Sequence, residues 1–269
     1  MTANKAAQYD LIAKYYDLFK EDKTDDIDFY RALAHEVGGS VLELACGTGR
    51  ILLELAAEGF YVTGVEISSG MLAVLHKKLE QKSAEVRERV VVFHGDMRGS
   101  LPDQDFALIF VAIDTWFQIE SAEDRKKILL NCRKRLKPNG CFALDTFVWD
   151  DGQHEGWSDR RPDGRVFYDG SWADPWVDAG VIQRFRSDVM EPASLHLRRT
   201  VFCDHVAKNG EIRRFTLTDD EYYVPPTQIE AELREAGFNG IDIYGGFNRE
   251  ELYAPSLAGR GRQVIIARA

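Results

Sequence analysis

The stretch VLELACGTGR, residues 41–50, decides the fold of this chain. Its first five residues form an apolar run that reads as a buried strand, and a short glycine turn leads from them into a helical pattern. Glycines at a strand-to-helix turn let the backbone approach a ligand, and the following helix offers free N–H groups. The stretch therefore predicts a ligand site at the carboxyl end of a buried strand.

Strands and helices alternate through the first half of the chain. Further strands are predicted within residues 61–67, 89–96, 106–114 and 141–147, with amphipathic helical patterns between them. This alternation is typical of a parallel sheet with helices on both faces. Before the glycine turn, residues 9–20 show apolar helical faces and predict an N-terminal helix.

The pattern changes after residue 150. Residues 150–180 are rich in Asp, Gly, Pro and Trp and predict a loop. Alternating apolar and polar residues follow over 180–223, where Asn209-Gly210 predicts a two-residue hairpin turn. These signals indicate an antiparallel insertion.

Composition limits the classes of partner. The chain has 269 residues, 45% hydrophobic and 29% charged, with a net charge of −10 and no long run of Lys or Arg, which argues against a nucleic-acid partner. The apolar stretches are strand-sized, which argues against a membrane, and the first residues lack the core of a signal peptide. The four cysteines show no metal-like spacing. We therefore expect a cytoplasmic protein with no metal and a small-molecule partner.

Three observations narrow the ligand of the glycine turn. No Gly-Lys-Ser or Gly-Lys-Thr follows it, which excludes a P-loop for nucleoside triphosphates. Leu52 stands where the dinucleotide fingerprint has its third glycine, so a pyrophosphate cradle is disfavoured. Glu43, inside the strand, would repel a pyrophosphate and attract an ammonium group. The ligand is therefore expected to carry positive charge and no phosphate.

Two further acids end the next two strands. Glu66 lies where a carboxylate can accept hydrogen bonds from two ribose hydroxyls. Asp96 lies where one can accept from an exocyclic adenine amine, with the N–H of Met97 available to a ring nitrogen. Glu66 on its own is equally consistent with a solvated charge at a strand end. Because ligands of open α/β sheets bind along the carboxyl edge, three acids there favour a nucleoside with an amino-acid tail.

Five segments resemble, in order and spacing, the motifs of class I S-adenosylmethionine-dependent methyltransferases. They are residues 41–50, 62–72, 91–98, 106–119 and 136–147. The chain looks most similar to the bacterial small-molecule members that include the amino-sugar N,N-dimethyltransferases. The resemblance covers roughly residues 9–150 and 226–269, and the chain's ending resembles the reversed hairpin of that family.

The resemblance implies an α/β fold with a seven-stranded, mostly parallel Rossmann-like sheet and a reversed C-terminal β-hairpin. A helical N-terminal lid and an antiparallel β insertion over the acceptor site complete the expected fold. The expected parts are the lid over 1–37, the cofactor-binding core over 38–149, the insertion over 150–225 and the C-terminal helix and hairpin over 226–269. The implied cofactor is S-adenosyl-L-methionine, with S-adenosyl-L-homocysteine as product.

The resemblance also implies cofactor contacts residue by residue. They are Tyr16 and Tyr30 in the lid; Glu43, Ala45, Cys46, Gly47 and Gly49 at the turn; Glu66, Ile67 and Met71 at the second strand; Asp96, Met97 and Arg98 at the third; and Ile113 after the fourth. Ala45 stands where many members have a glycine. We expect its methyl group to be tolerated if the backbone angles there are ordinary.

Three residues are expected to act in catalysis. Tyr16 is expected to line the sulfonium, whose charge an aromatic face stabilises. Asp114 is placed to orient an ammonium group or accept a proton. Gln118 stands where many relatives have histidine, and loss of that imidazole base favours nitrogen over oxygen as the acceptor atom.

The expected acceptor contacts are Trp116, Trp149, His154 and Trp172, with His154 as a reserve base. Aromatic side chains of the insertion would line a site for a flat or apolar ligand, or else pack the insertion onto the core. A homodimer through the edge of the antiparallel sheet is a further expectation.

The sequence thus predicts an S-adenosylmethionine-dependent methyltransferase that acts on a small molecule by in-line transfer, more readily at nitrogen. The alternatives are an O- or C-methyltransferase and a non-methylating S-adenosylmethionine-binding protein of the same fold. Leu52 and Glu43 disfavour a nicotinamide-dependent oxidoreductase, and Glu66 and Asp96 argue against a non-catalytic scaffold.

Overall fold

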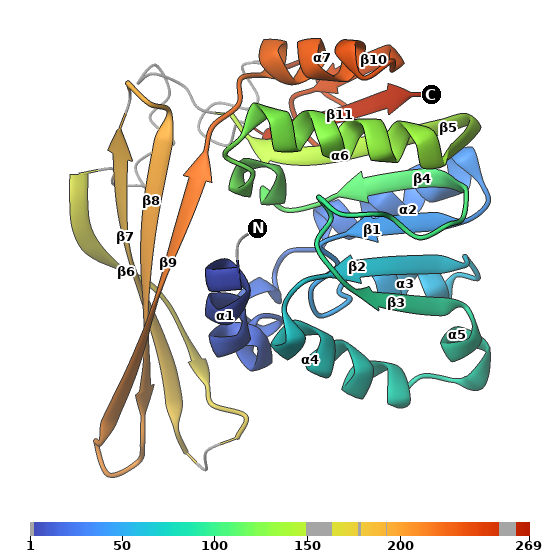
Figure 1. Cartoon of the computed structure of the whole chain (residues 1–269). Helices are drawn as coiled ribbons and strands as arrows, with labels where there is room; N and C mark the ends of the chain where they lie inside the picture. The colour runs from blue at the N-terminus through green and yellow to red at the C-terminus, as the bar shows by residue number, and fades with distance from the viewer. Residues whose placement is uncertain (1–2, 149–162, 177–178, 192, 253–261) are drawn as a thin grey trace. The chain divides into compact units, whose positions relative to one another are not determined.

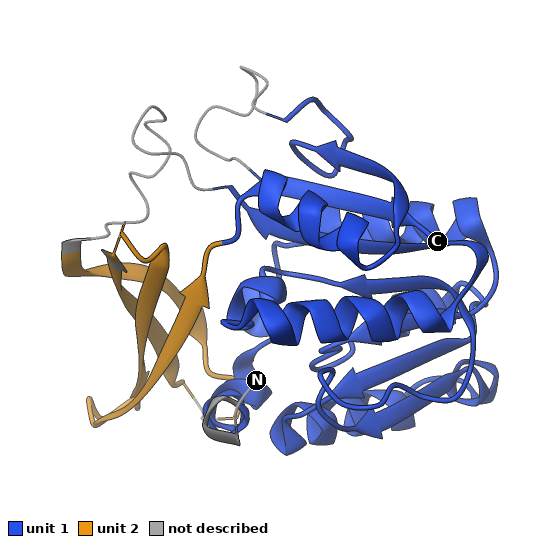
Figure 2. Ribbon diagram, turned by 45° about the horizontal axis from the view of Figure 1, so that its top comes forward, with its two compact units in different colours: residues 1–154, 224–269 blue, residues 155–223 orange. Residues whose placement is uncertain are grey.

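The computed structural model describes residues 3–148, 163–176, 179–191, 193–252 and 262–269. The chain divides into two compact units, coloured separately in Figure 2. The first combines Met1–His154 with Val224–Ala269, and the second is Glu155–Tyr223. No helix in the described part of the chain is both long and apolar enough to cross a membrane.

Seven strands form the sheet of the first unit (Figure 1). They are β1 (Val41–Leu44), β2 (Val62–Glu66), β3 (Val90–His94), β4 (Phe106–Val111), β5 (Leu136–Phe147), β10 (Asn239–Tyr244) and β11 (Arg262–Arg268). Their order is β10-β11-β5-β4-β1-β2-β3. The first five strands are parallel, whereas β11 runs antiparallel to both β5 and β10. The predicted fold class, with its reversed C-terminal hairpin, is confirmed.

The carboxyl ends of β1, β2, β3 and β4 meet at one edge of this sheet. In the register, Leu44 lies beside Val65 and Val111, and Glu66 lies beside His94. Every residue of β1, β2 and β4 is buried, as expected for central strands of a parallel sheet that is covered on both faces. The segments that follow these strands are therefore neighbours in space, although they lie far apart in the sequence.

Helices cover both faces of the sheet, with α2 and α3 behind it in Figure 1 and α6 in front. The helical elements are α1 (Ala3–Ile12), η1 (Ala13–Tyr15), η2 (Leu18–Lys20), α2 (Asp25–Val37), α3 (Leu52–Ala57), α4 (Ser69–Glu80), α5 (Ala84–Glu88), η3 (Thr115–Gln118), α6 (Ala122–Arg135) and α7 (Pro226–Glu235). Apolar side chains of α2, α3 and α4 pack with β1, β4, β5 and β11 in one core cluster.

The predicted continuous helix over residues 9–20 is wrong. The α-helix ends at Ile12, and two short 3₁₀ turns follow it. Side chains of this stretch bind to α4 and to the glycine turn, with Asp17 contacting Thr48 and Lys78. Such tertiary contacts override a helical pattern, because propensity is a weak determinant of short helices.

The second unit is a four-stranded antiparallel sheet in the order β6-β7-β8-β9. Its strands are β6 (Asp163–Ala173), β7 (Val181–Glu191), β8 (His196–Val206) and β9 (Ile212–Tyr222). The predicted loop over 150–180 is therefore wrong for residues 163–173, which are a strand. The hairpin at Asn209-Gly210 is present, but Ala207 and Glu211 close a three-residue loop with Gly210 at φ +84°.

Candidate active site

The turn after β1 bends through three residues with positive φ: Ala45 at +56°, Gly47 at +56° and Gly49 at +75°. Glycine adopts this left-handed conformation without strain, whereas an alanine there is unfavourable. The expectation that Ala45 has ordinary backbone angles is therefore wrong. A Cβ on Gly49 would lie 3.0 Å from Cγ of Leu75 in α4, so helix α4 packs directly against the turn.

Glu66 ties the end of β2 to this turn. Its Oε2 accepts the N–H of Gly47 at 2.9 Å, and its Oε1 accepts the N–H of Ser68 at 2.7 Å. The side chain is buried. Burial raises the pKa of the Glu66 carboxyl, and hydrogen bonds from the N–H groups of Ser68 and Gly47 lower that pKa in part. The N–H of Ile67 also donates to this carboxylate, whose two oxygens together can accept about four hydrogen bonds, so there is room for a ligand hydroxyl.

Glu43 lies inside β1 and is only 4% exposed. The N–H of Leu52 donates a hydrogen bond to it, but its Oε2 has no hydrogen-bond partner among the described residues. Burial raises the pKa of the Glu43 carboxyl well above its usual range, and the Arg50 guanidinium opposes that shift. A buried carboxylate oxygen of this kind is stabilised when a cationic group donates to it.

A small pocket opens at the ends of β1, β2 and β3. It is lined by Ala45, Val65, Ile67, Gly95, Asp96 and Met97. Oδ2 of Asp96 is 2.6 Å from a guanidinium nitrogen of Arg98, which also contacts Asp124 at 3.3 Å. Partial burial raises the pKa of Asp96, but hydrogen bonds from the Arg98 side chain and N–H bring it below its usual range. Asp96 is therefore held as an acceptor at the pocket wall.

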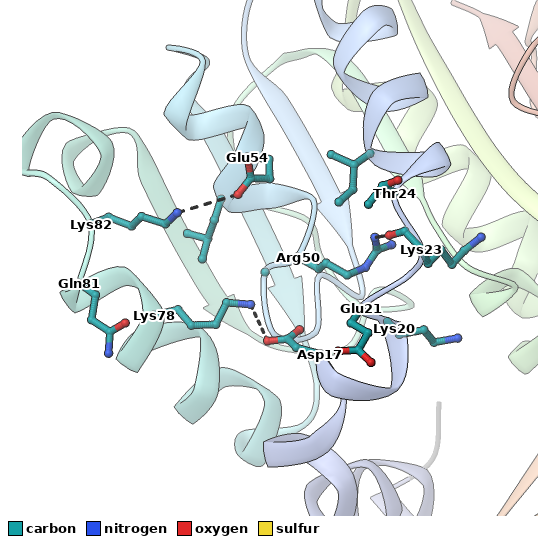
Figure 3. Close-up of a pocket in the computed structure, with 13 residues that line it drawn as sticks. Asp17, Lys20, Glu21, Lys23, Thr24, Arg50, Glu54, Lys78, Gln81 and Lys82 are labelled. Atoms are coloured by element: carbon teal, nitrogen blue, oxygen red, sulfur yellow. Dashed lines mark hydrogen bonds and ion pairs between the residues drawn. The ribbon is translucent and has the colours of Figure 1, made fainter. Parts of the chain in front are cut away.

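The N-terminal segment docks on the residues around this pocket. Oδ1 of Asp10 accepts the hydroxyl of Ser68 at 2.5 Å and the N–H of Gly70 at 2.7 Å, at the start of α4. Asp17 accepts the hydroxyl of Thr48, in the glycine turn, at 2.5 Å and binds Lys78 at 2.8 Å (Figure 3). Two lid carboxylates thus contact the segments that follow β1 and β2.

A larger hollow of about 500 Å³ lies beside this contact, between the lid and helices α3 and α4 (Figure 3). Three of its basic side chains form ion pairs: Lys78 with Asp17, Lys82 with Glu54 at 3.9 Å, and Arg50 with the buried Asp26. Lys20 and Lys23 also line the hollow, so its lining holds more basic than acidic side chains.

Tyr16 lies close enough to the turn that the charges of Arg50 and Glu66 affect the pKa of its hydroxyl. Burial raises the pKa of its hydroxyl, which therefore stays protonated at neutral pH. Tyr15, by contrast, is a buried core residue. The structure thus brings Tyr16 toward the predicted cofactor residues.

Asp114 and Gln118 follow β4. Asp114 Oδ1 accepts the N–H of Phe147 at 2.7 Å, and its two oxygens lie 3.3 and 3.4 Å from the guanidinium nitrogens of Arg262. The buried Gln118 donates from Nε2 to the hydroxyl of Tyr9 in α1. Both side chains are therefore engaged with other elements of the first unit.

Asp145 in β5 is fully buried behind Asp114. It accepts the hydroxyl of Tyr30 at 2.8 Å and the N–H of Ile113 at 3.1 Å, and it forms an ion pair with Arg262. Burial raises the pKa of the Asp145 carboxyl, and the Arg262 guanidinium opposes this. Tyr30 is itself a core residue, stacked on Phe110 at 4.2 Å between ring centroids. Its predicted contact with the cofactor stays a prediction.

The predicted acceptor residues fall in different places. Trp116 is fully buried and packs edge-on against Phe142 at 6.0 Å. Trp172 lies in the second unit, with the guanidinium of Arg184 5.1 Å from its ring centroid. Trp149 and His154 lie outside the described residues. The contact of Trp116 with an acceptor stays a prediction.

Residues 41–140 match the family model of a methyltransferase domain. This match covers the glycine turn and all three acids at the carboxyl edge. The putative methyltransferase YqeM of Bacillus subtilis is 26% identical over 220 residues, which span 81% of this chain and 81% of that protein.

Two further proteins are similar along most of the chain. A dTDP-4-amino-2,3,4,6-tetradeoxy-D-glucose N,N-dimethyltransferase of Saccharopolyspora spinosa is 25% identical over 223 residues, covering 80% of this chain and 77% of that protein. The crystal structure of DesVI of Streptomyces venezuelae shares the fold, with a TM-score of 0.71 at 20% identity over 95% of this chain and 97% of that chain.

The protein is an S-adenosylmethionine-dependent methyltransferase. Its residues fit that cofactor, which carries an ammonium group, ribose hydroxyls and an adenine. The buried Glu43 oxygen without a partner suits the ammonium group, and the remaining acceptor capacity of Glu66 suits a ribose hydroxyl. The pocket beside Asp96 and Met97 suits the adenine edge. Within the described residues no cluster of His, Cys, Asp or Glu could hold a metal ion.

The structure adds residues of the methyltransferase that the sequence analysis missed. Asp10 and Asp17 connect the N-terminal segment to the segments that follow β2 and β1, where the cofactor contacts are predicted. Asp145 with Arg262 supports the segment after β4. A charged residue inside an apolar strand, as in CFALDTF at 141–147, was the available signal for Asp145. Met71 and Cys46, both predicted cofactor contacts, are buried beside the turn segments.

Proposed function

We propose that this methyltransferase moves a methyl group to the nitrogen of a small-molecule amine. The observation that carries the proposal is the side chain at position 118, an amide bonded to the hydroxyl of Tyr9 and not a titratable base. An amide cannot take the proton of a hydroxyl nucleophile at neutral pH, whereas an amine can bind in its neutral form and needs no such base.

The state of Asp114 supports the same acceptor class. Its oxygens already accept from Phe147 and face Arg262, so this carboxylate is poorly placed to remove a proton from a hydroxyl. A fixed carboxylate can still orient an amine, because N–H groups of the acceptor can donate to its remaining lone pairs. We therefore assign Asp114 an orienting role.

When bound, S-adenosylmethionine supplies an electrophilic methyl group on its sulfonium. Glu43, Glu66 and Asp96 hold the three polar parts of the ligand along the sheet edge. Tyr16 would stabilise the sulfonium cation with its aromatic ring, and the segment after β4 would align the acceptor nitrogen with the methyl group. Alignment of this kind accounts for a large part of the rate of a bimolecular transfer.

The relatives support an acceptor class for the proposed reaction. An amino-sugar N,N-dimethyltransferase matches most of the chain, which supports an amino group on a small polar molecule. We keep as predictions the acceptor contacts Trp116, Trp149, His154 and Trp172. The homodimer through the insertion stays a prediction, which light scattering tests directly.

The test is a comparison of matched amines and alcohols, such as amino sugars and the corresponding hydroxyl sugars, with S-adenosylmethionine and product detection by mass spectrometry. We expect methylation of the amine partner and a rate that rises with pH as the neutral amine becomes populated. Comparable methylation of the hydroxyl partner contradicts the assignment to nitrogen. Binding of S-adenosylhomocysteine without methylation of either sugar contradicts the proposed acceptor class.

A further inference from the structure

The turn between β4 and η3 is strained at two consecutive residues. Ile113 has a φ of +54° and Asp114 a φ of +57°. Both values lie in the left-handed region, which is unfavourable for residues with a side chain and most of all for β-branched isoleucine. Two such residues in succession persist only where the surrounding contacts hold them in place.

The contacts that hold this turn come from β5. Oδ1 of Asp145 accepts the N–H of Ile113 at 3.1 Å, and the backbone carbonyl of Asp145 accepts the N–H of Asp114 at 3.1 Å. In return, Oδ1 of Asp114 accepts the N–H of Phe147 at 2.7 Å. The strained turn is thus bonded to β5 in both directions.

Arg262 joins the two carboxylates of this arrangement. It forms an ion pair with the fully buried Asp145 and faces both oxygens of Asp114. Two carboxylates this close repel one another, and Asp145 without a cation would be a buried uncompensated charge. The Arg262 side chain is only 17% exposed, and a planar guanidinium can serve both acids at once.

The reversed hairpin explains how an arginine reaches this place. Arg262 is the first residue of β11 and pairs in register with Phe147, at the carboxyl end of β5. A parallel strand would bring its last residue to that edge, whereas the antiparallel β11 brings its first. The turn that Arg262 holds leads directly into η3, which carries Trp116 and Gln118.

We propose that Arg262 is a positioning residue for methyl transfer. It holds the Ile113–Asp114 turn in its strained form and so fixes the segment 113–118 at the edge of the sheet where transfer takes place. It acts through Asp145 and Asp114 and leaves the cofactor residues on β1 and β2 unaffected. The proposal depends on the methyltransferase activity and is independent of whether the acceptor atom is nitrogen.

Two variants test the proposal. Arg262→Lys keeps the positive charge but loses the planar guanidinium group that contacts both Asp145 and Asp114. The double variant Arg262→Met with Asp145→Asn removes the ion pair without leaving a buried charge. It is therefore expected to fold even if the single Arg262 variant does not. Arg268→Met is the matched control, because Arg268 lies on the same strand and pairs with Asp242 at the protein surface.

The measurements are hydrogen exchange by mass spectrometry, S-adenosylhomocysteine binding by calorimetry, and steady-state kinetics with an accepted amine. For both Arg262 variants we expect exchange in residues 106–119 to become about tenfold faster, because the amides of the turn lose their fixed acceptor. We expect unchanged exchange in 62–71. The loss of S-adenosylhomocysteine affinity is expected to stay below about fivefold, because the predicted contact Ile113 lies in the turn whereas Glu66 and Asp96 lie outside it. We expect kcat to fall by about tenfold or more, and by more than KM for S-adenosylmethionine rises.

Unchanged exchange over 106–119 in both variants overturns the proposal. Faster exchange across the whole sheet together with weaker S-adenosylhomocysteine binding also overturns it, because that pattern is a general loss of stability. If no amine is accepted, the exchange and binding results still decide the role of Arg262, so failure of the proposed function is distinguished from failure of this inference.

Discussion

Oε2 of Glu66, the last residue of β2, accepts the backbone N–H of Gly47 at 2.9 Å. The same carboxylate therefore shapes the turn after β1 and presents its other lone pairs at the edge of the sheet. Because Glu66 is also the predicted acceptor of the ribose hydroxyls, its loss is expected to remove a ligand contact together with a support of the turn. This double role makes the residue a sensitive probe of the cofactor site.

Replacement of Ala45 by glycine is expected to stabilise the protein. The left-handed backbone at Ala45 destabilises the native state by about 1–2 kcal/mol, and glycine removes this penalty. Glycine also gives the unfolded chain more conformational entropy, which offsets part of that gain in stability. We expect Ala45→Gly to raise the free energy of unfolding by about 0.5–1 kcal/mol in urea denaturation. The control Ala73→Gly, at an exposed position of α4, should lower it by about 1 kcal/mol. A lower stability of Ala45→Gly contradicts the assigned backbone conformation.

Glu43 is expected to make stability fall as pH rises. Burial raises its pKa in the native state above that in the unfolded chain, so the native state binds more protons between the two values. The free energy of unfolding therefore decreases as pH rises through that window, and Glu43→Gln removes the decrease. We expect Glu43→Gln to be more stable by about 1–2 kcal/mol at neutral pH, with weaker S-adenosylhomocysteine binding. Urea unfolding at several pH values checks this, and a stability difference that does not change with pH contradicts it.

Asp10 is expected to hold the lid on the cofactor segments. Asp10→Ala removes the acceptor of the Ser68 hydroxyl and the Gly70 N–H, at a cost of about 0.5–2 kcal/mol for a helix cap. Hydrogen exchange in residues 3–20 should rise, and S-adenosylhomocysteine should dissociate faster. The exposed Asp22→Ala serves as the control. Equal exchange of residues 3–20 in both variants removes Asp10 from this role.

The sheet and its ligand edge could be predicted from the sequence because both depend on local patterns. Apolar runs define the buried strands, and Glu66 and Asp96 follow their strands directly, so parallel topology alone brings the two acids to one edge. The glycine turn was visible for the same reason. The backbone conformation of the turn could not be predicted, because the sequence around Ala45 does not distinguish a positive φ from a negative one.

The contacts around Asp145 could not be predicted, because they join residues far apart in the chain. Arg262 and Asp145 are 117 positions apart, and their pairing depends on the register of β11 against β5. The prediction of one helix over residues 9–20 is wrong for a related reason. The helical pattern there is local, whereas the contacts of Asp17 with Thr48 and Lys78 are not. Charged residues within apolar segments were the only sequence signal for these contacts.

Calorimetric titration with S-adenosylhomocysteine tests the central claim most directly, with NAD as the competing ligand and Glu66→Ala as the variant. We expect S-adenosylhomocysteine to bind the unmodified protein and NAD not to bind. We expect Glu66→Ala to weaken binding by about 1–3 kcal/mol, or about 5- to 150-fold in Kd, while the exposed Glu80→Ala leaves it unchanged. Binding of NAD in place of S-adenosylhomocysteine, or equal affinity of the Glu66→Ala protein, would contradict the account.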